Sequence, residues 1–188
     1  MRIANYKEIS FAFGKTPKFV LWVQGCKHNC KKCIAKQWQN LEGGEEKSNE
    51  DLTKLIFQSK VEGVVLSGGE PLLQYEDILV LVNLLRKDNL GIILYTGFSK
   101  KDVEENYSEI LDFIDVIISG QYIESKNNGR GLRGSTNQEI EFLTNRYLEE
   151  KDFFYNGNRI LEIDIENEAI SFCGIPPLDA NILFQAGK

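Results

Sequence analysis

Three cysteines are the residues in this chain best suited to chemistry. Cys26, Cys30 and Cys33 have C-x3-C-x2-C spacing and follow the apolar run Phe19–Val23. A 4Fe-4S cubane normally takes four cysteine ligands, so three thiolates hold three irons and leave the fourth open to a small molecule. The spacing therefore predicts a catalytic iron–sulfur site rather than cysteines that only stabilise the fold.

Other uses of these cysteines are weaker. A zinc site would add His28, the sole histidine of the chain, to the three thiols. Zinc ligands usually come as two separated pairs, whereas these four residues are crowded together in sequence. Disulfides are uncommon in the cytosol. We expect Cys173, on a predicted strand, to be a small buried residue and not a fourth ligand.

A second motif, Ser67-Gly68-Gly69-Glu70-Pro71, also ends an apolar run. Two glycines let main-chain groups approach a bound molecule closely, and the Glu70 carboxylate can accept a hydrogen bond from an ammonium group. Alone, the motif would read as an ordinary strand-to-helix turn. Beside an iron-site motif it predicts a small-molecule site.

Size and charge exclude several classes of protein. The chain has 188 residues, is 42% hydrophobic and carries a net charge of −6. This length and apolar content predict one compact domain. The charge argues against nucleic-acid or anionic-membrane binding. No apolar stretch is long enough to span a bilayer, and polar residues interrupt the start of the chain, so we expect a cytoplasmic location.

The apolar pattern predicts alternating strands and helices. We expect strands at Phe19–Gln24, Gly63–Leu66, Ile92–Tyr95 and Ile114–Ile118, and helices at Ser48–Lys60, Tyr75–Lys87 and from Ser99 to about Leu111. This pattern indicates a parallel sheet covered by helices, with ligands bound beyond the carboxyl ends of the strands. The cysteine loop, Ser67–Pro71, Thr96-Gly97 and Ser119-Gly120 should therefore gather at one edge.

The pattern changes towards the C-terminus. Three short runs, Phe153–Tyr155, Arg159–Ile165 and Ala169–Phe172, predict a small antiparallel appendage, with a hairpin turn at Asn156-Gly157 between the first two. We divide the chain into a core, residues 1–147, and a C-terminal extension of the same domain, residues 148–188.

Together these motifs resemble the radical S-adenosylmethionine superfamily. Within it, the closer resemblance is to the activating component of anaerobic ribonucleotide reductase. The matching strings are Val23-Gln24-Gly25-Cys26, Leu66-Ser67-Gly68-Gly69, Tyr95-Thr96-Gly97-Phe98 and Leu132-Arg133-Gly134-Ser135-Thr136-Asn137-Gln138. The resemblance implies an α/β fold, a partial (βα) barrel with a mostly parallel sheet, here with a small C-terminal β extension.

The resemblance also implies cofactors and their contacts. They are a 4Fe-4S cluster and S-adenosylmethionine, whose methionine amino and carboxylate groups would chelate the open iron. Gly68, Gly69 and Glu70 would hold the amino group, while Lys32 and Ile34 would line the adenine. The ribose or methionine part would face Thr96, Gly97 and Ser119.

The implied reaction is radical formation. An electron from the reduced cluster enters the sulfonium, the carbon–sulfur bond breaks, and the 5′-deoxyadenosyl radical abstracts a hydrogen from the target. The leading hypothesis is an activase that installs a glycyl radical on a partner such as anaerobic ribonucleotide reductase. Radical modification of a peptide or small molecule is an alternative, and a non-catalytic iron–sulfur sensor is another.

Two basic features suggest protein contacts. Lys27, Lys31, Lys32 and Lys36 surround the cysteines in an otherwise acidic chain. They either offset the charge of the cluster or form a docking patch for an acidic electron donor such as flavodoxin. We also hypothesise that the segment Arg130–Gln138, which includes Arg133, contacts the partner protein.

Overall fold

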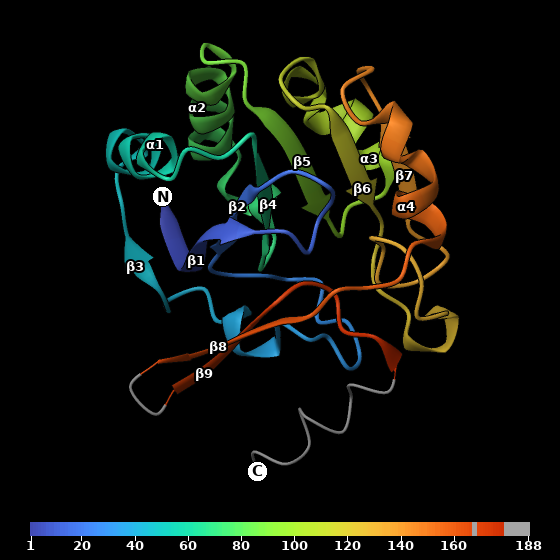
Figure 1. The fold of residues 1–188 in the computed structure, drawn as a ribbon. Coiled ribbons are helices and arrows are strands. Elements are labelled where there is room, and N and C mark those ends of the chain that lie inside the picture. Colours follow the sequence, from blue (N-terminus) through green and yellow to red (C-terminus); the bar gives the residue numbers. More distant parts are fainter. Residues whose placement is uncertain (167–168, 179–188) are drawn as a thin grey trace.

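A mixed sheet forms the centre of the molecule (Figure 1). The computed structural model describes residues 1–166 and 169–178. Within them, seven strands pair in the order β3-β1-β2-β4-β5-β6-β7. Their bounds are β1 Arg2–Ser10, β2 Lys18–Val23, β3 Glu45–Glu46, β4 Gly63–Gly68, β5 Gly91–Thr96, β6 Val116–Ser119 and β7 Glu139–Phe142. The inner strands β2, β4, β5 and β6 are parallel, whereas β1, β3 and β7 are antiparallel to their neighbours.

Both faces of the inner strands are buried, which explains their nearly continuous apolar sequences. Alternate side chains enter different cores: Leu66 and Leu94 face helices α1 (Asn49–Gln58), α2 (Tyr75–Arg86) and α3 (Lys100–Asn106), which cover one side of the sheet (Figure 1). Val65 and Ile93 belong to the core on the opposite side. The parallel register aligns the carboxyl ends of these strands along one edge.

The predicted helix starts are confirmed by their caps. The Ser48 hydroxyl accepts a hydrogen bond from the Asp51 amide ahead of α1. Ser99 and Asp102 form a reciprocal capping box ahead of α3. Helix α3 is shorter than predicted, because it ends at Asn106 and a separate 3-10 turn follows at Ser108–Asp112. None of the helices described is long and apolar enough to cross a membrane.

One predicted strand is wrong. Phe153–Tyr155 lies in helix α4 (Lys151–Asn156), and Asn156-Gly157 ends that helix instead of turning a hairpin. The aromatic residues favoured a strand by propensity, but packing decides: the Phe154 ring is fully buried, 5.2 Å from the Phe142 ring and 6.1 Å from the Tyr147 ring.

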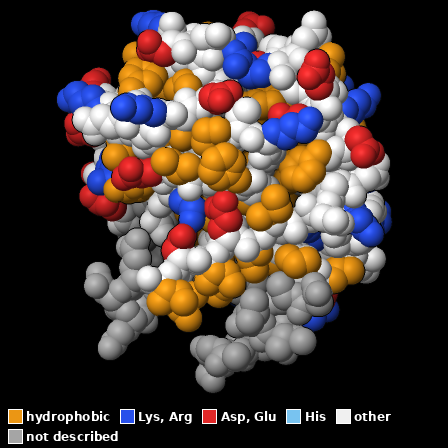
Figure 2. All heavy atoms as spheres, in the orientation of Figure 1, with side chains coloured by type: hydrophobic (Ala, Val, Ile, Leu, Met, Phe, Trp, Pro, Cys, Tyr) orange, Lys and Arg blue, Asp and Glu red, His pale blue; other side chains and the backbone are white. Residues whose placement is uncertain are grey.

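The rest of the predicted appendage is confirmed as an antiparallel hairpin of β8 (Glu162–Glu166) and β9 (Ala169–Cys173). Its polar side faces the body of the molecule, where the Lys7 ammonium lies 3.5 Å from the Glu162 carboxylate. Its other side exposes Ile163, Ile165 and Ile170, by 49%, 73% and 59% respectively, and Figure 2 shows apolar side chains gathered over this part of the molecule.

Candidate functional site

The cysteine loop leaves β2 at the carboxyl edge of the sheet. Main-chain hydrogen bonds close its base, from the Gly25 amide to the Trp38 carbonyl at 2.8 Å and from the Cys26 amide to the Gln39 carbonyl at 3.1 Å. The Trp38 ring packs against Trp22 of β2 with 5.4 Å between centroids. The core thus fixes both ends of the loop.

All three loop cysteines are free and half-buried. Asn29 and Lys32 have left-handed backbone conformations, with φ of 50° and 56°, and each directly precedes a cysteine. Burial raises the pKa of the Cys26 thiol, and the nearby charges of Glu70, Cys33 and Cys30 raise it further. The Cys33 amide donates to the Cys30 carbonyl at 3.3 Å, so these two cysteines share one tight turn.

The two glycines at the end of β4, Gly68 and Gly69, let that strand end against the base of the cysteine loop. Gly68 has a φ of +103°, which strains other residues, and a Cβ on Gly69 would lie only 2.3 Å from the Gly25 carbonyl oxygen. The Gly69 amide donates to the Val23 carbonyl and the Glu70 amide to the Gly25 carbonyl, both at 2.8 Å. The motif therefore sets the position of the cysteine loop relative to the sheet.

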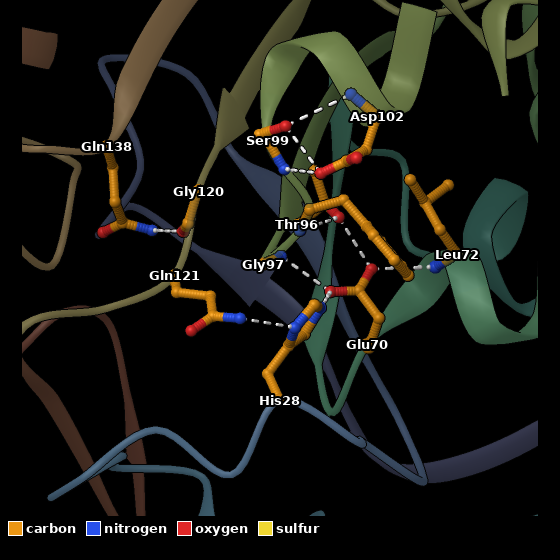
Figure 3. A network of polar contacts seen from close by, with 11 residues as sticks. His28, Glu70, Leu72, Thr96, Gly97, Ser99, Asp102, Gly120, Gln121 and Gln138 are labelled. Carbon is orange, nitrogen blue, oxygen red and sulfur yellow. Dashed lines mark hydrogen bonds and ion pairs between the residues drawn. The ribbon is translucent and has the colours of Figure 1, made fainter. Parts of the chain in front are cut away.

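The Glu70 carboxylate is the centre of the polar network in Figure 3. It is 1% exposed and accepts four hydrogen bonds. Oε1 accepts from the Leu72 amide at 3.0 Å and the Thr96 hydroxyl at 2.8 Å, and Oε2 from the Gly97 amide at 2.6 Å. His28 Nε2 lies 3.1 Å from Oε2. All partners are donors, as an ionised carboxylate requires, so binding an ammonium group here means displacing one of them.

His28 links the cysteine loop to two strand ends. Its Nε2 faces Glu70, and its Nδ1 lies 3.1 Å from Gln121 Nε2 (Figure 3). Because Glu70 accepts only, we assign the ring hydrogen to Nε2, which leaves Nδ1 to accept from Gln121. The Phe98 ring meets the imidazole edge-on at 4.8 Å. With both nitrogens engaged, this histidine does not complete a zinc site with the thiols.

A cavity of about 420 Å³ opens beside this network. That volume suits a small molecule. Its lining comes from the cysteine loop and the segments after β5 and β6: His28, Gly97, Phe98, Ser99, Asp102, Gly120 and Gln121.

Sequence comparison decides the family. A family model described as "4Fe-4S single cluster domain" matches residues 13–141. The anaerobic ribonucleoside-triphosphate reductase-activating protein of Vibrio cholerae is 30% identical over 154 residues, covering 77% of this chain and 99% of that protein. Its counterpart in Enterobacteria phage T4 is 32% identical over 146 residues, covering 72% and 92%. The chain belongs to this activating-protein family.

Other relatives agree. The activating protein of Escherichia coli K12 is 28% identical over 153 residues and covers 76% of this chain and 99% of its own length. Among solved structures, QueE from Escherichia coli overlaps 52% of this chain and 53% of its own, with 25% identity and a TM-score of 0.41. That overlap is too small to bear on the fold.

Most site residues predicted from the family resemblance converge. Glu70, Thr96 and Gly97 are hydrogen-bonded together, and Ser119 is the direct neighbour of Thr96 in the sheet. Gly97 lines the cavity, whereas Thr96 and Ser119 are buried, 4% and 3% exposed. Their contacts with S-adenosylmethionine stay a prediction.

Lys32 and Ile34, the predicted adenine contacts, are exposed residues of the cysteine loop. The Lys32 ammonium is exposed and pairs with Glu124 at 2.7 Å, which raises the pKa of the lysine. Ile34 is 55% exposed. In this member of the activating-protein family, Lys32 is therefore tied to the segment after β6.

Sequence reasoning did not single out Gln121 as a site residue. Besides its contact with His28, it is held by the Asn137 side-chain amide, which donates to the Gln121 carbonyl at 2.8 Å. Gln138 likewise donates to the Gly120 carbonyl at 2.8 Å. A usable signal existed: Gln121 follows a strand that ends at the binding edge.

The arginines of the predicted partner-contact segment hold that segment together. Arg133 donates to the carbonyls of Thr136 and Gln138 at 3.1 and 3.3 Å, and its guanidinium lies 5.4 Å from the Tyr155 ring centroid. Arg130 donates to the Asn158 side chain at 2.7 Å. An alanine at Arg133 would thus test the shape of the segment as much as a contact.

Arg159, in the C-terminal extension, is hydrogen-bonded to the same segment. Its guanidinium is buried, with 8% of the residue exposed. It donates to the Asn127 side chain and to the main-chain carbonyls of Arg130, Gly131, Arg133, Gly134 and Pro176. Five carbonyls on one guanidinium make this arginine the anchor of the loop around residues 130–134.

Proposed function

We propose that this chain is a radical S-adenosylmethionine enzyme that installs a glycyl radical on a partner enzyme, with an anaerobic ribonucleoside-triphosphate reductase as the expected partner. The observation that carries the proposal is a loop with three free cysteines that is joined through His28 to the buried Glu70 network, beside a cavity at one sheet edge. The named relatives are activating proteins of such reductases, and this chain covers 99% of the Vibrio cholerae protein.

The chemistry of three free thiols suits a 4Fe-4S cluster with one open iron, while the described residues hold no group of three such side chains already spaced around a metal ion. Cys26, Cys30 and Cys33 would each hold one iron, and S-adenosylmethionine would occupy the fourth. When bound and reduced, the cluster supplies the electron that cleaves the carbon–sulfur bond. Cys173 takes no part, because it is 1% exposed, bonded to the Ser10 hydroxyl and has its pKa raised by burial to about 12.

The protein groups bind and orient. We assign the methionine and ribose part to Gly68, Gly69, Glu70, Thr96, Gly97 and Ser119, and the adenine to Lys32 and Ile34. Glu70 fixes the Gly97 amide and the His28 ring next to the cavity, so these groups are oriented before a ligand arrives. The Phe98 ring packs on His28 at 4.8 Å and lines the cavity beside it.

We extend the proposal to architecture and location. The four parallel inner strands support the partial-barrel type of sheet. The buried Phe154 and Arg159 support treating residues 148–188 as an extension of the domain formed by residues 1–147. Iron–sulfur chemistry with free thiols supports a cytoplasmic location.

The electron donor we propose is an acidic protein such as flavodoxin. Lys27, Lys31 and Lys36 are exposed around the cysteine loop. A chain with Lys27→Glu and Lys31→Glu should be reduced by flavodoxin more slowly, and the deficit should shrink as salt is added. Lys54→Glu, on helix α1, is the matched control. Equal reduction rates in the wild type, the double variant and the Lys54→Glu control would contradict this part of the proposal.

The decisive experiment is anaerobic reconstitution with iron and sulfide, followed by dithionite reduction and a chromatographic assay for 5′-deoxyadenosine. An activase forms deoxyadenosine and, with the reductase present, a glycyl radical visible by electron-spin resonance. A peptide modifier forms deoxyadenosine without that radical, and a sensor forms neither. Cys30→Ala should abolish deoxyadenosine formation, whereas Cys173→Ala should preserve it.

A further inference from the structure

The four hydrogen-bond donors around the Glu70 carboxylate differ in how firmly the fold holds them. Two are main-chain amides, Leu72 and Gly97, and neither can turn away without moving the backbone. The third is the hydroxyl of Thr96, a residue of β5 that is 4% exposed. The fourth is the ring of His28, whose side chain is 14% exposed and comes from a loop without regular secondary structure. The imidazole is therefore the donor that can leave most easily.

His28 also stands where a ligand would approach Glu70. The imidazole and Gly97 line the cavity of about 420 Å³, whereas Thr96 is not among the lining residues. Figure 3 shows the ring between Glu70 and Gln121. On Oε2 the other donor is the fixed Gly97 amide. A ligand group that reaches Oε2 from the cavity thus competes with the imidazole.

The competition favours an amino group over the imidazole. The imidazole is neutral, because its Nδ1 accepts from Gln121 while its Nε2 donates to Glu70. An amino group that carries a positive charge, or that is bound to a metal ion, is a stronger donor to a carboxylate. Without a ligand, a buried carboxylate still needs its donors, since burial without hydrogen bonds is costly. A neutral donor that can be displaced meets both needs.

We infer that His28 is a positioning residue that occupies the place of the S-adenosylmethionine amino group on Glu70 and leaves it when S-adenosylmethionine binds. The inference rests on the proposed function, because it needs S-adenosylmethionine to bring its amino group to Glu70. His28 lies between Cys26 and Cys30 in the sequence. Its release would therefore loosen one attachment of the cysteine loop to the sheet at the moment of binding.

The first test compares two ligands of the cluster-loaded protein by anaerobic equilibrium binding: S-adenosylmethionine and its analogue without the amino group. Only S-adenosylmethionine competes with the imidazole. In His28→Ala the preference for S-adenosylmethionine over the analogue should rise about two- to tenfold, the effect of one hydrogen bond that no longer has to be broken. His28→Gln should restore the wild-type preference, because its longer side-chain amide can donate to Glu70.

The ratio of the two affinities separates displacement from a structural role. A disturbed cysteine loop would change the affinity for both ligands alike and leave their ratio unchanged. If His28→Ala does not retain its iron, His28→Asn takes its place, because the asparagine amide is too short to reach Glu70. Glu105→Gln, which removes an exposed ion pair on helix α3, is the control and should keep the wild-type ratio.

The second test needs no variant. A crystal structure of the cluster-loaded protein with S-adenosylmethionine should show the amino nitrogen within hydrogen-bond distance of Glu70 and the His28 ring beyond that distance. A ring still bonded to Glu70 in that structure would overturn the inference. So would equal affinity ratios in the wild type and the His28 variants, although the proposed function would then stand. A cluster-loaded wild type that does not bind S-adenosylmethionine overturns both.

Discussion

Replacing Glu70 by glutamine tests whether the buried carboxylate organises the site. Each carboxylate oxygen accepts one main-chain amide, from Leu72 on Oε1 and from Gly97 on Oε2. A glutamine has only one accepting oxygen, so in either amide orientation its NH2 group faces one of these N–H groups. The Thr96 hydroxyl and the His28 ring can reverse their donor roles, but a main-chain amide cannot.

The expected magnitude follows from that count. One buried N–H left without an acceptor costs about 1–3 kcal/mol, and the remaining bonds lose the strength that a charged acceptor gives them. We expect Glu70→Gln to lower the free energy of unfolding by about 3 kcal/mol. For a chain of this size, that lowers Tm by roughly 6–12 °C.

The assay monitors urea and thermal unfolding by circular dichroism. It uses the cluster-free protein, so that differences in metal content do not affect the measured stability. Glu46→Gln is the matched control, because Glu46 pairs with Arg2 at 2.7 Å but its side chain is 77% exposed. The control should change Tm by no more than a degree or two. If the Tm of Glu70→Gln were no lower than the Tm of Glu46→Gln, our view of Glu70 as the organising acceptor would be wrong.

Four further predictions test other parts of the molecule. A Cβ on Gly97 would lie 2.4 Å from His28 Cδ2, so Gly97→Ala should weaken cluster retention, measured as iron content, and should do so much less in a His28→Ala background. Burial raises the pKa of the Cys173 thiol to about 12, and so alkylation at pH 8, followed by mass spectrometry, should be slow there until the chain unfolds. Above pH 9 the unfolded chain loses this proton while the folded chain keeps it, so stability should fall with rising pH, and less steeply in Cys173→Ala. Arg159→Met leaves five carbonyls without their donor and should speed tryptic cleavage after Arg130 about tenfold, whereas unchanged cleavage would contradict its role as anchor.

The inner strands and their helices could be predicted because burial on both faces leaves a continuous apolar run, as in β2. The edge strand β1, Arg2–Ser10, could not, since it is only partly buried and its polar residues hide the pattern. The cysteines and Glu70 could be predicted as site residues from the spacing of residues in local motifs. The contact between His28 and Gln121 was not, because it joins residues 93 positions apart and depends on how strand ends meet.

The late position of Arg159 in the sequence also sets the order in which parts of the molecule become fixed during synthesis. The cysteines, the Glu70 motif and the Leu132–Gln138 string all leave the ribosome before this arginine does. Until it arrives, the carbonyls of Arg130, Gly131, Arg133 and Gly134 lack this donor, and the loop is not attached to the C-terminal extension through it. A prematurely terminated chain would therefore keep its thiols yet lack the finished surface, which separates the capacity to take up iron from the capacity to meet a partner.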